Sequence, residues 1–298
     1  MGNFYIWSGD VQGLVKYFDP NLLPEYQYWN IESLAETVNW KQVKNIHCIE
    51  EGLWWKCQEE YVGPDIIICG PCSSVLDIAW RLSAAHCLNS WDSVISVEQW
   101  AGRGQLRRRW SSPIGNIYAA LKCSDLANLF NICLPVIMGF CLIKSFEETG
   151  VSLNLKWPND LMLNRQKVGG ILVEEKENNV FVGIGINLNR IPVISENGNP
   201  GVSAIQSFQG PPQSVNLANF WQRLVHRVIL WYEALAANDH MQSIADQVEQ
   251  VMEFLGEEIE IKSYGERFTA KILGVDNSLG LRVEKGGRKQ VLYNASLL

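Results

Sequence analysis

Residues 65–99 read DIIICGPCSSVLDIAWRLSAAHCLNSWDSVISVEQ, and this stretch decides the fold. The apolar run from Asp65 to Cys69 predicts a buried strand, and Ser93 to Gln99 predicts a second strand. Between them, Val75 to Leu88 predicts a helix. Strands that alternate with a helix in this way indicate an α/β or α+β core.

Further strands and helices of the same core are expected later in the chain. Val180 to Ile186 predicts another strand of the core. Residues 216–237 predict an amphipathic helix packed on that core, because apolar side chains recur there at three- and four-residue steps. These side chains are Leu217, Phe220, Leu224, Val228, Trp231 or Tyr232, and Leu235.

After about residue 254 the pattern changes to short alternating strands separated by turn signals. The expected strands are 259–262, 268–273, 281–284 and 290–293, and the turns carry Asp276-Asn277, Gly280 and Gly286-Gly287. This pattern predicts a small β-barrel at the C-terminus.

Length and composition limit the classes of protein to consider. The chain has 298 residues, 47% of them hydrophobic, and a net charge of −7, which is typical of a soluble globular protein of about two domains. The acidic balance argues against a general nucleic-acid binder.

The most apolar run, Ile132 to Ile143, contains Pro135 and is too short to span a membrane, so we expect a buried helix or strand there. No secretory signal opens the sequence, and a cytoplasmic location is expected.

Eight cysteines are scattered along the chain, several of them in apolar surroundings, such as Cys123, Cys133 and Cys141. Cys69 and Cys72 have the C-x-x-C spacing of a redox pair or of half a zinc site. No second pair at metal-binding spacing accompanies them, so we favour a structural or incidental role and expect no metal site in the protein.

The first segment with chemical character is GRGQLRRRWSSPIGNIY, residues 102–118. Its first nine residues hold two glycines and four arginines and no acid. Such a loop is flexible and cationic, and guanidinium groups suit phosphate oxygens, so an anion would order it. Trp110 offers an apolar wall for a ligand ring. A solvated basic loop explains the same residues equally well.

Two further segments follow. The segment KWPNDLML (156–163) predicts a turn after the strand 153–155. This turn places Lys156 at the strand end, beside Asn159 and Asp160. A lysine in that position can hold a carboxylate and a phosphate together. KVGGILVE (167–174) and GIGINLN (183–189) place glycines in strands, where a ligand, a bulge or tight packing needs them. An ordinary surface lysine and a plain turn remain alternatives.

Taken together, these segments resemble the biotin protein ligase family in order and spacing over roughly residues 70–298. The resemblance implies an α+β fold, with a mixed-sheet catalytic domain of the biotin/lipoate ligase type and an SH3-like C-terminal barrel. The implied boundaries are an N-terminal extension of unknown role at 1–62, a catalytic domain at 63–252 and the barrel at 253–298. The implied reaction is attachment of biotin to one lysine of a biotin carboxyl carrier protein, with ATP and Mg²⁺, through biotinyl-5′-AMP.

The resemblance also assigns residues. Lys156 and Arg103 would be catalytic. The implied biotin-binding residues are Ser73, Ser74, Gln99, Gly102, Arg103, Lys156, Gly170 and Gly185. The implied adenylate-binding residues are Gly104, Arg108, Trp110, Asn159, Asp160 and Asn187.

Three positions depart from the family pattern. Val75 stands where the family has Asn, Gln105 where many members have Arg, and Arg107 where many have Gly. Differently placed cations predict looser retention of the adenylate.

The acidic residues 1–60 lack a helix-turn-helix pattern, so we expect no DNA binding. A homodimer is expected only by analogy with relatives. Lipoate protein ligase and a non-catalytic biotin or adenylate sensor remain alternatives.

Overall fold

The computed structural model describes residues 1–9, 13–26, 28–29, 39–44, 50–123, 133–192, 202–206, 216–237 and 240–298. The chain folds into two compact units. The first comprises Met1–Asp125 and Val168–His226, and the second comprises Leu126–Lys167 and Arg227–Leu298. Helix α4 (Leu217–Ala236), which matches the predicted amphipathic helix, runs through the division at residue 226.

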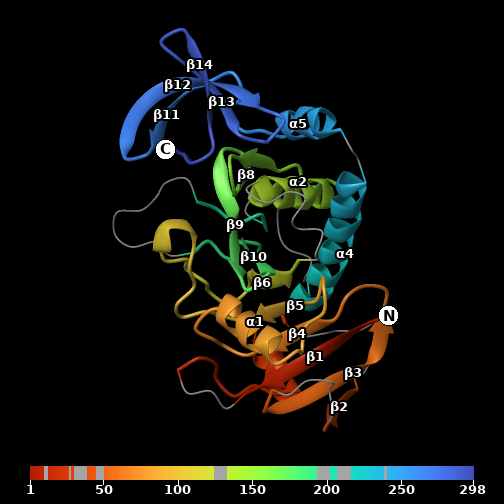
Figure 1. Ribbon diagram of the computed structural model, residues 1–298. Coiled ribbons are helices and arrows are strands. Elements are labelled where there is room, and N and C mark those ends of the chain that lie inside the picture. The colour runs from red at the N-terminus through yellow and green to blue at the C-terminus, as the bar shows by residue number, and fades with distance from the viewer. Residues whose placement is uncertain are drawn as a thin grey trace. The chain divides into compact units, whose positions relative to one another are not determined.

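The first unit is built on a mixed β-sheet with the strand order β2, β3, β1, β4, β5, β6, β10, β9 (Figure 1). Strands β1, β4 and β5 run parallel, whereas β5, β6, β10 and β9 pair antiparallel. The predicted α+β class with a mixed sheet is confirmed. The strands are β1 (Gly2–Ser8), β2 (Trp40–Val43), β3 (Leu53–Tyr61), β4 (Ile66–Cys69), β5 (Ser93–Ser96), β6 (Ile117–Lys122), β9 (Gln166–Lys176) and β10 (Asn179–Ile186).

The N-terminal 61 residues supply three strands of this sheet, a role that the sequence did not reveal. Strand β1 lies between β3 and β4. Beyond β1, the Ser73 amide donates to the Leu14 carbonyl at 2.7 Å, and the Lys16 amide donates to the Pro71 carbonyl at 2.9 Å. The segment around Lys16 therefore pairs with the chain that follows β4.

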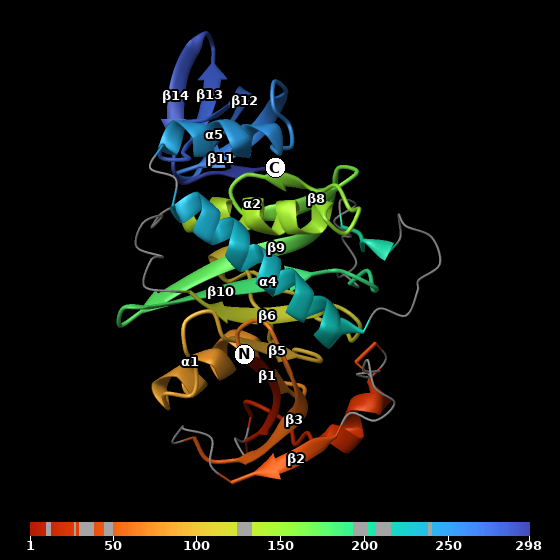
Figure 2. The ribbon, with the colours of Figure 1, turned by 90° about the vertical axis from the view of Figure 1, so that its right-hand side faces the viewer.

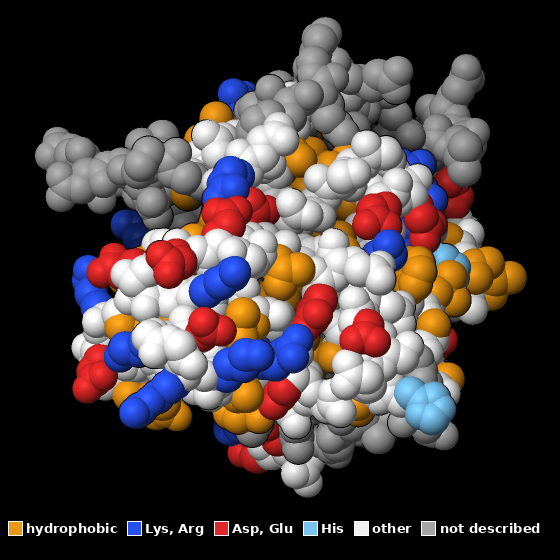
Figure 3. Space-filling model, turned by 90° about the horizontal axis from the view of Figure 1, so that it is seen from above, with side chains coloured by type: hydrophobic (Ala, Val, Ile, Leu, Met, Phe, Trp, Pro, Cys, Tyr) orange, Lys and Arg blue, Asp and Glu red, His pale blue; other side chains and the backbone are white. Residues whose placement is uncertain are grey.

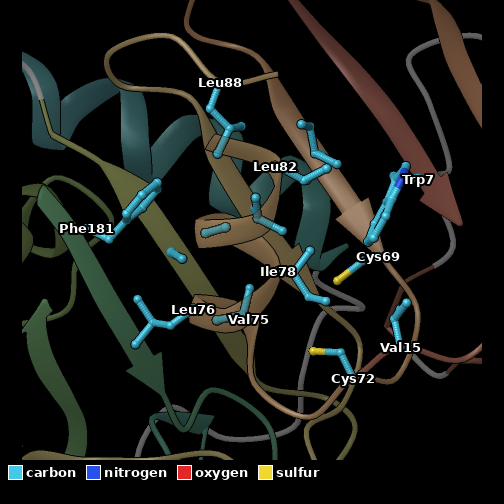
Figure 4. Close-up of a cluster of buried hydrophobic side chains, with 14 of the residues drawn as sticks. Trp7, Val15, Cys69, Cys72, Val75, Leu76, Ile78, Leu82, Leu88 and Phe181 are labelled. Atoms are coloured by element: carbon cyan, nitrogen blue, oxygen red, sulfur yellow. The ribbon is translucent and has the colours of Figure 1, made fainter. Parts of the chain in front are cut away.

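Helix α1 (Val75–Ala84) packs its apolar side on β5, β6 and β10. Figure 4 shows Leu76 and Ile78 of this helix between Phe181 and Trp7, within one cluster of buried side chains. The helix ends four residues before the predicted Leu88, because His86 adopts a left-handed backbone with φ of 58°. A residue in that conformation cannot continue a right-handed helix.

The C-x-x-C pair belongs to the same buried cluster. Cys69 and Cys72 are free and fully buried. The hydrogen bond with Cys72, together with burial, raises the pKa of the Cys69 thiol well above its ordinary value. These thiols therefore act as small core side chains, as the structural interpretation expected. Cys87 differs from the scattered free cysteines because it is disulfide-bonded.

The second unit contains helix α2, a short hairpin, helix α5 and a five-stranded antiparallel sheet with the order β14, β13, β12, β11, β15 (Figure 2). Glu249 of α5 joins helix and sheet, since its carboxylate accepts the Val275 amide at 2.8 Å and Arg282 Nη2 at 2.7 Å. The elements are α2 (Leu134–Glu147), β7 (Asn154–Lys156), β8 (Asp160–Leu163), α5 (Met241–Gln250), β11 (Glu258–Ser263), β12 (Glu266–Val275), β13 (Leu281–Lys285), β14 (Arg288–Leu292) and β15 (Ser296–Leu297).

The five strands agree with the predicted SH3-like barrel. The predicted apolar run is helix α2, with Pro135 in its first turn; Ile132 lies outside the described residues. No helix in the described ranges is long and apolar enough to cross a membrane. On the face seen in Figure 3, Lys and Arg side chains interleave with Asp and Glu, so neither charge dominates that face.

Candidate functional site

Residues 99–112 form a narrow hairpin, which we call the arginine hairpin. Its two arms meet at the bridges Gln99 to Ser112 and Arg103 to Arg109. The Trp110 amide donates to the Gly102 carbonyl at 2.8 Å, which closes the hairpin further. The sequence predicted a flexible loop that an anion would order, and in the structure backbone hydrogen bonds join the two arms of this segment.

The tip of the arginine hairpin is a short 3-10 turn, Gln105–Arg107. Leu106 and Arg107 have φ of 56° and 58°, in the left-handed region that favours glycine. The departure from the family pattern at Arg107 thus falls on a position where the backbone itself favours glycine. Leu106 is 76% exposed, and the arginines that follow it are exposed as well.

Gly102 and Gln99 are used to build the base of the hairpin. A Cβ atom on Gly102 would lie 2.7 Å from the Trp110 carbonyl oxygen, so only glycine fits there. The Gln99 side-chain oxygen accepts the Val75 amide at 2.7 Å, and its Nε2 donates to Ser112 Oγ at 2.8 Å. The structure therefore shows Gln99 joining the hairpin to the start of helix α1.

Arg103 is held by two carboxylates. Its Nε and Nη2 donate to Glu174 at 2.8 and 3.1 Å, and its Nη1 donates to Asp77 at 2.6 Å. The hydrogen bond to Glu174 and that to Asp77 raise the pKa of Arg103, although burial opposes them. The guanidinium that the sequence assigned to the ligand thus already has protein partners.

Ser73 and Ser74 lie at the start of helix α1, and both are buried. Ser73 Oγ donates to Asp77 Oδ2 at 3.0 Å. Ser74 is the N-cap residue, and its carbonyl accepts the first amide hydrogen bonds of the helix. The two serines predicted to bind biotin are thereby fixed close to the arginine hairpin through Asp77.

Trp110 lies over strand β10. A Cβ atom built on Gly185 would come within 2.6 to 2.7 Å of three atoms of the Trp110 indole. Gly185 is also paired across the sheet with Gly170 on one side and Tyr118 on the other. Close packing of this indole explains the glycine at position 185, and it sets the ring beside β10 as a wall for a planar ligand.

This contact makes a stability prediction. We expect Gly185→Ala to lower the free energy of unfolding by about 1–3 kcal/mol, because the new methyl overlaps the indole of Trp110. In a Trp110→Ala background the same substitution should cost close to nothing. Denaturant unfolding of the four proteins measures the cycle. An equal cost in both backgrounds would show that Trp110 does not set the requirement for glycine.

Asn187 and Asn116 order the end of strand β10. Asn187 is 1% exposed, and its Nδ2 donates to the Ser203 carbonyl at 3.1 Å. Among the described residues, no donor reaches its Oδ1, so this buried acceptor is left without a hydrogen bond. Asn116 Oδ1 accepts three successive amides, those of residues 188, 189 and 190, at 3.0, 3.1 and 2.9 Å.

The role of Asn116 was missed by the sequence reasoning. Its Nδ2 also donates to the Arg190 carbonyl at 2.9 Å, and the side chain is completely buried. The available signal was the Gly115-Asn116 turn before strand β6, at the end of the arginine-rich segment. Asn116 fixes the turn that directly follows Asn187.

The second unit presents Lys156 on the hairpin of β7 and β8, with the predicted turn between the strands. The peptide bond between Trp157 and Pro158 is cis. Trp157 is buried, and its Nε1 donates to the Leu279 carbonyl of the C-terminal sheet at 3.0 Å. Lys156 lies opposite Asp160, whose carboxylate forms an ion pair with Lys167. The hairpin is therefore anchored within its unit through the buried indole.

Each unit collects a subset of the predicted residues. Those of the second unit share one hairpin and are Lys156, Asn159 and Asp160. Those of the first unit are Ser73, Ser74, Gln99, Gly102, Arg103, Gly104, Arg108, Trp110, Gly170, Gly185 and Asn187.

Comparison with known proteins shows what part of this chain is similar to. Residues 83–189 match the model of the biotin/lipoate A/B protein ligase family. A relative named biotin–[acetyl-CoA-carboxylase] ligase, from Paracoccus denitrificans, is 33% identical over 46% of this chain and 57% of its own length. The bifunctional ligase/repressor BirA of Bacillus subtilis is 25% identical over 68% of this chain and 65% of its own length. The chain thus spans less than two thirds of these relatives.

A solved structure shares the fold. The biotin protein ligase from Aquifex aeolicus, in complex with biotin and ATP, superposes with a TM-score of 0.69 at 22% identity. The match covers 78% of this chain and 98% of that one. Residues 83–189 are therefore similar to the biotin/lipoate A/B protein ligase family, and the chain has the fold of a biotin protein ligase.

Proposed function

We propose that the protein activates biotin with ATP to biotinyl-5′-adenylate and transfers the biotinyl group to one lysine of a biotin carboxyl carrier protein or domain. One observation carries the proposal. The family match at residues 83–189 contains both the arginine hairpin and Lys156. The named ligase relative supports the same reaction, as do the biotin and ATP bound by the similar Aquifex aeolicus ligase.

The side chains suit the two chemical demands of this reaction. In the first step the biotin carboxylate attacks the α-phosphate of ATP and pyrophosphate leaves. Two anions must approach each other, and we assign Lys156 to stabilise that charge. In the second step an amine of the acceptor attacks the acyl carbon and AMP leaves. The mixed anhydride must be kept from water until then, which is the task we assign to the arginine hairpin with Gly104 and Arg108.

The adenylate needs a flat apolar surface and a few polar contacts. We assign Trp110 to the adenine ring and the buried Asn187 Oδ1 to a hydrogen-bond donor of the nucleotide. Ser73, Ser74, Gln99, Gly102, Gly170 and Gly185 line the proposed biotin side. Because Gln99 already bonds Val75 and Ser112, its proposed contribution is to shape that pocket.

Mg²⁺ is proposed as the cofactor that enters with ATP. Within the ranges that the structure describes, no three His, Cys, Asp or Glu side chains gather as a metal site. The Asp160 carboxylate is also paired with Lys167. Mg²⁺ is commonly bound by one or two carboxylates together with substrate phosphates. We therefore assign Asn159 and Asp160 as auxiliary contacts to an ion held chiefly by ATP.

The proposed organisation keeps the predicted segments 1–62, 63–252 and 253–298, with a cytoplasmic location and no DNA binding.

The test of the proposed reaction is transfer of labelled biotin to a purified carrier domain with Mg-ATP, run beside labelled lipoate. We expect biotin transfer and little lipoate transfer. Transfer of lipoate without transfer of biotin would indicate a lipoate protein ligase instead. Binding of biotin with neither transfer nor pyrophosphate release would indicate a sensor.

A further inference from the structure

One guanidinium fastens the arginine hairpin to two other elements. Arg103 bonds Glu174 in strand β9 at 2.8 and 3.1 Å and Asp77 in the first turn of helix α1 at 2.6 Å. All three of its side-chain nitrogens are used in these bonds. Among the described residues, Arg107 and Arg108 at the tip form no ion pair with a carboxylate.

Both carboxylates are themselves fixed in place. Trp80 Nε1 donates to Glu174 Oε2 at 2.8 Å, and Ser73 Oγ donates to Asp77 Oδ2 at 3.0 Å. Burial alone would raise the pKa of Glu174, but the hydrogen bonds from Arg103 and Trp80 outweigh it and lower that pKa. The two carboxylates are therefore held in place for Arg103 by their other hydrogen bonds.

We infer that Arg103, Asp77 and Glu174 form a latch that holds the arginine hairpin closed, with Arg103 as a positioning residue. A phosphate that took the Arg103 guanidinium would leave two half-buried carboxylates without their cation. Arg107 and Arg108 would leave no carboxylate without its cation among the described residues, so these two arginines are the cations that meet an anionic ligand. The latch also shares Asp77 with Ser73, which couples closure of the hairpin to a residue of the proposed biotin pocket.

The identity of the covered ligand rests on the proposed function, but the latch itself is testable without any ligand. Trypsin cleaves after arginine, and cleavage needs a locally opened chain. The tip and the first residues of the arm after it offer three consecutive sites at Arg107, Arg108 and Arg109. We would follow their cleavage in the full chain by mass spectrometry, for the wild type, Glu174→Gln, Glu174→Asp and the control Glu175→Gln, whose exposed side chain is the next residue of β9.

We expect Glu174→Gln to be cleaved about tenfold faster at the tip than the wild type, because losing one charged partner of a half-buried pair shifts the opening equilibrium by roughly that factor. Glu174→Asp keeps the charge and should fall between them, and Glu175→Gln should match the wild type. Equal tip cleavage in all four proteins would overturn the latch. Equal acceleration by Glu174→Gln and Glu175→Gln would do the same.

A second measurement separates the latch from the proposed reaction. Release of labelled biotinyl-adenylate, formed without acceptor, should also quicken about tenfold in Glu174→Gln, while saturating biotin and ATP leave the rate of adenylate formation nearly unchanged. Slower formation with unchanged release would overturn the positioning role. If the wild type forms no adenylate, the proposed function fails, whereas tip cleavage still decides the latch.

Discussion

Lys156→Ala is expected to lower the rate of biotinyl-adenylate formation by about a thousandfold. The ammonium group is assigned to the charge that develops when a carboxylate approaches a phosphate, and removing one such stabilising group costs on the order of 10² to 10³ in rate. The measurement is pyrophosphate release with saturating biotin and Mg-ATP, together with label transfer to the carrier domain. Lys156 lies at a strand end while the neighbouring Trp157 anchors the hairpin, so the fold should survive the substitution.

The matched control is Lys176→Ala, at the exposed end of strand β9, where Lys176 pairs only with Glu177 of the adjoining turn in the described structure. This variant should retain the wild-type rate. A Lys156→Ala protein that forms adenylate normally but fails in transfer would reassign Lys156 to the second step. Unchanged rates in both steps would remove it from the active site.

Asn116→Ala is expected to lower the free energy of unfolding by about 3–5 kcal/mol. Three backbone amides converge on the Asn116 oxygen inside the protein, and each buried donor left without an acceptor costs about 1–3 kcal/mol, although an entering water recovers part of this. Denaturant unfolding measures the loss. Because the turn at 188–190 directly follows Asn187, the affinity for ATP should weaken as well.

Asn179→Ala is the control for Asn116, since in the described structure the Asn179 side chain, at the start of β10, donates only to the Glu177 carbonyl of the preceding turn. Its effect should stay within about 0.5 kcal/mol. Asn116→Asp keeps an oxygen for the three amides but loses the Nδ2 donor, so it should lie between wild type and Ala. A loss below about 1 kcal/mol for Asn116→Ala would mean that the turn has other support.

The sequence predicted those elements whose pattern is local. Strands β4 and β10, helix α4 and the C-terminal strands follow from runs of apolar side chains with turn residues at their ends. The turn after Lys156 followed from Trp157-Pro158, because proline restricts the residue before it. Helix α1 was predicted too long, since nothing in the sequence marked His86 as left-handed.

Long-range partners could not be predicted. Arg103 appeared free to meet a ligand because Asp77 and Glu174 are 26 and 71 residues away in the chain. The sequence offered a ligand, a bulge or tight packing as reasons for the glycine at 185, and only the structure shows that the Trp110 indole packs against it. Strand β1 was missed because its partners β3 and β4 follow it at a distance in the chain and its register with β3 is interrupted between Asn3 and Tyr5. Strands β2 and β3 pair with each other and, through β3, with β1.

The place of strand β1 has a practical consequence for protein production. An N-terminal segment with no evident role invites deletion to obtain a shorter catalytic fragment. Such a deletion would strip the partner from β4, whose four residues Ile66–Cys69 are all buried, and leave an apolar strand with unpaired amides at the margin of the sheet. Exposed sheet edges with unpaired backbone groups pair with strands of other molecules. The shortened protein would accumulate as insoluble aggregates.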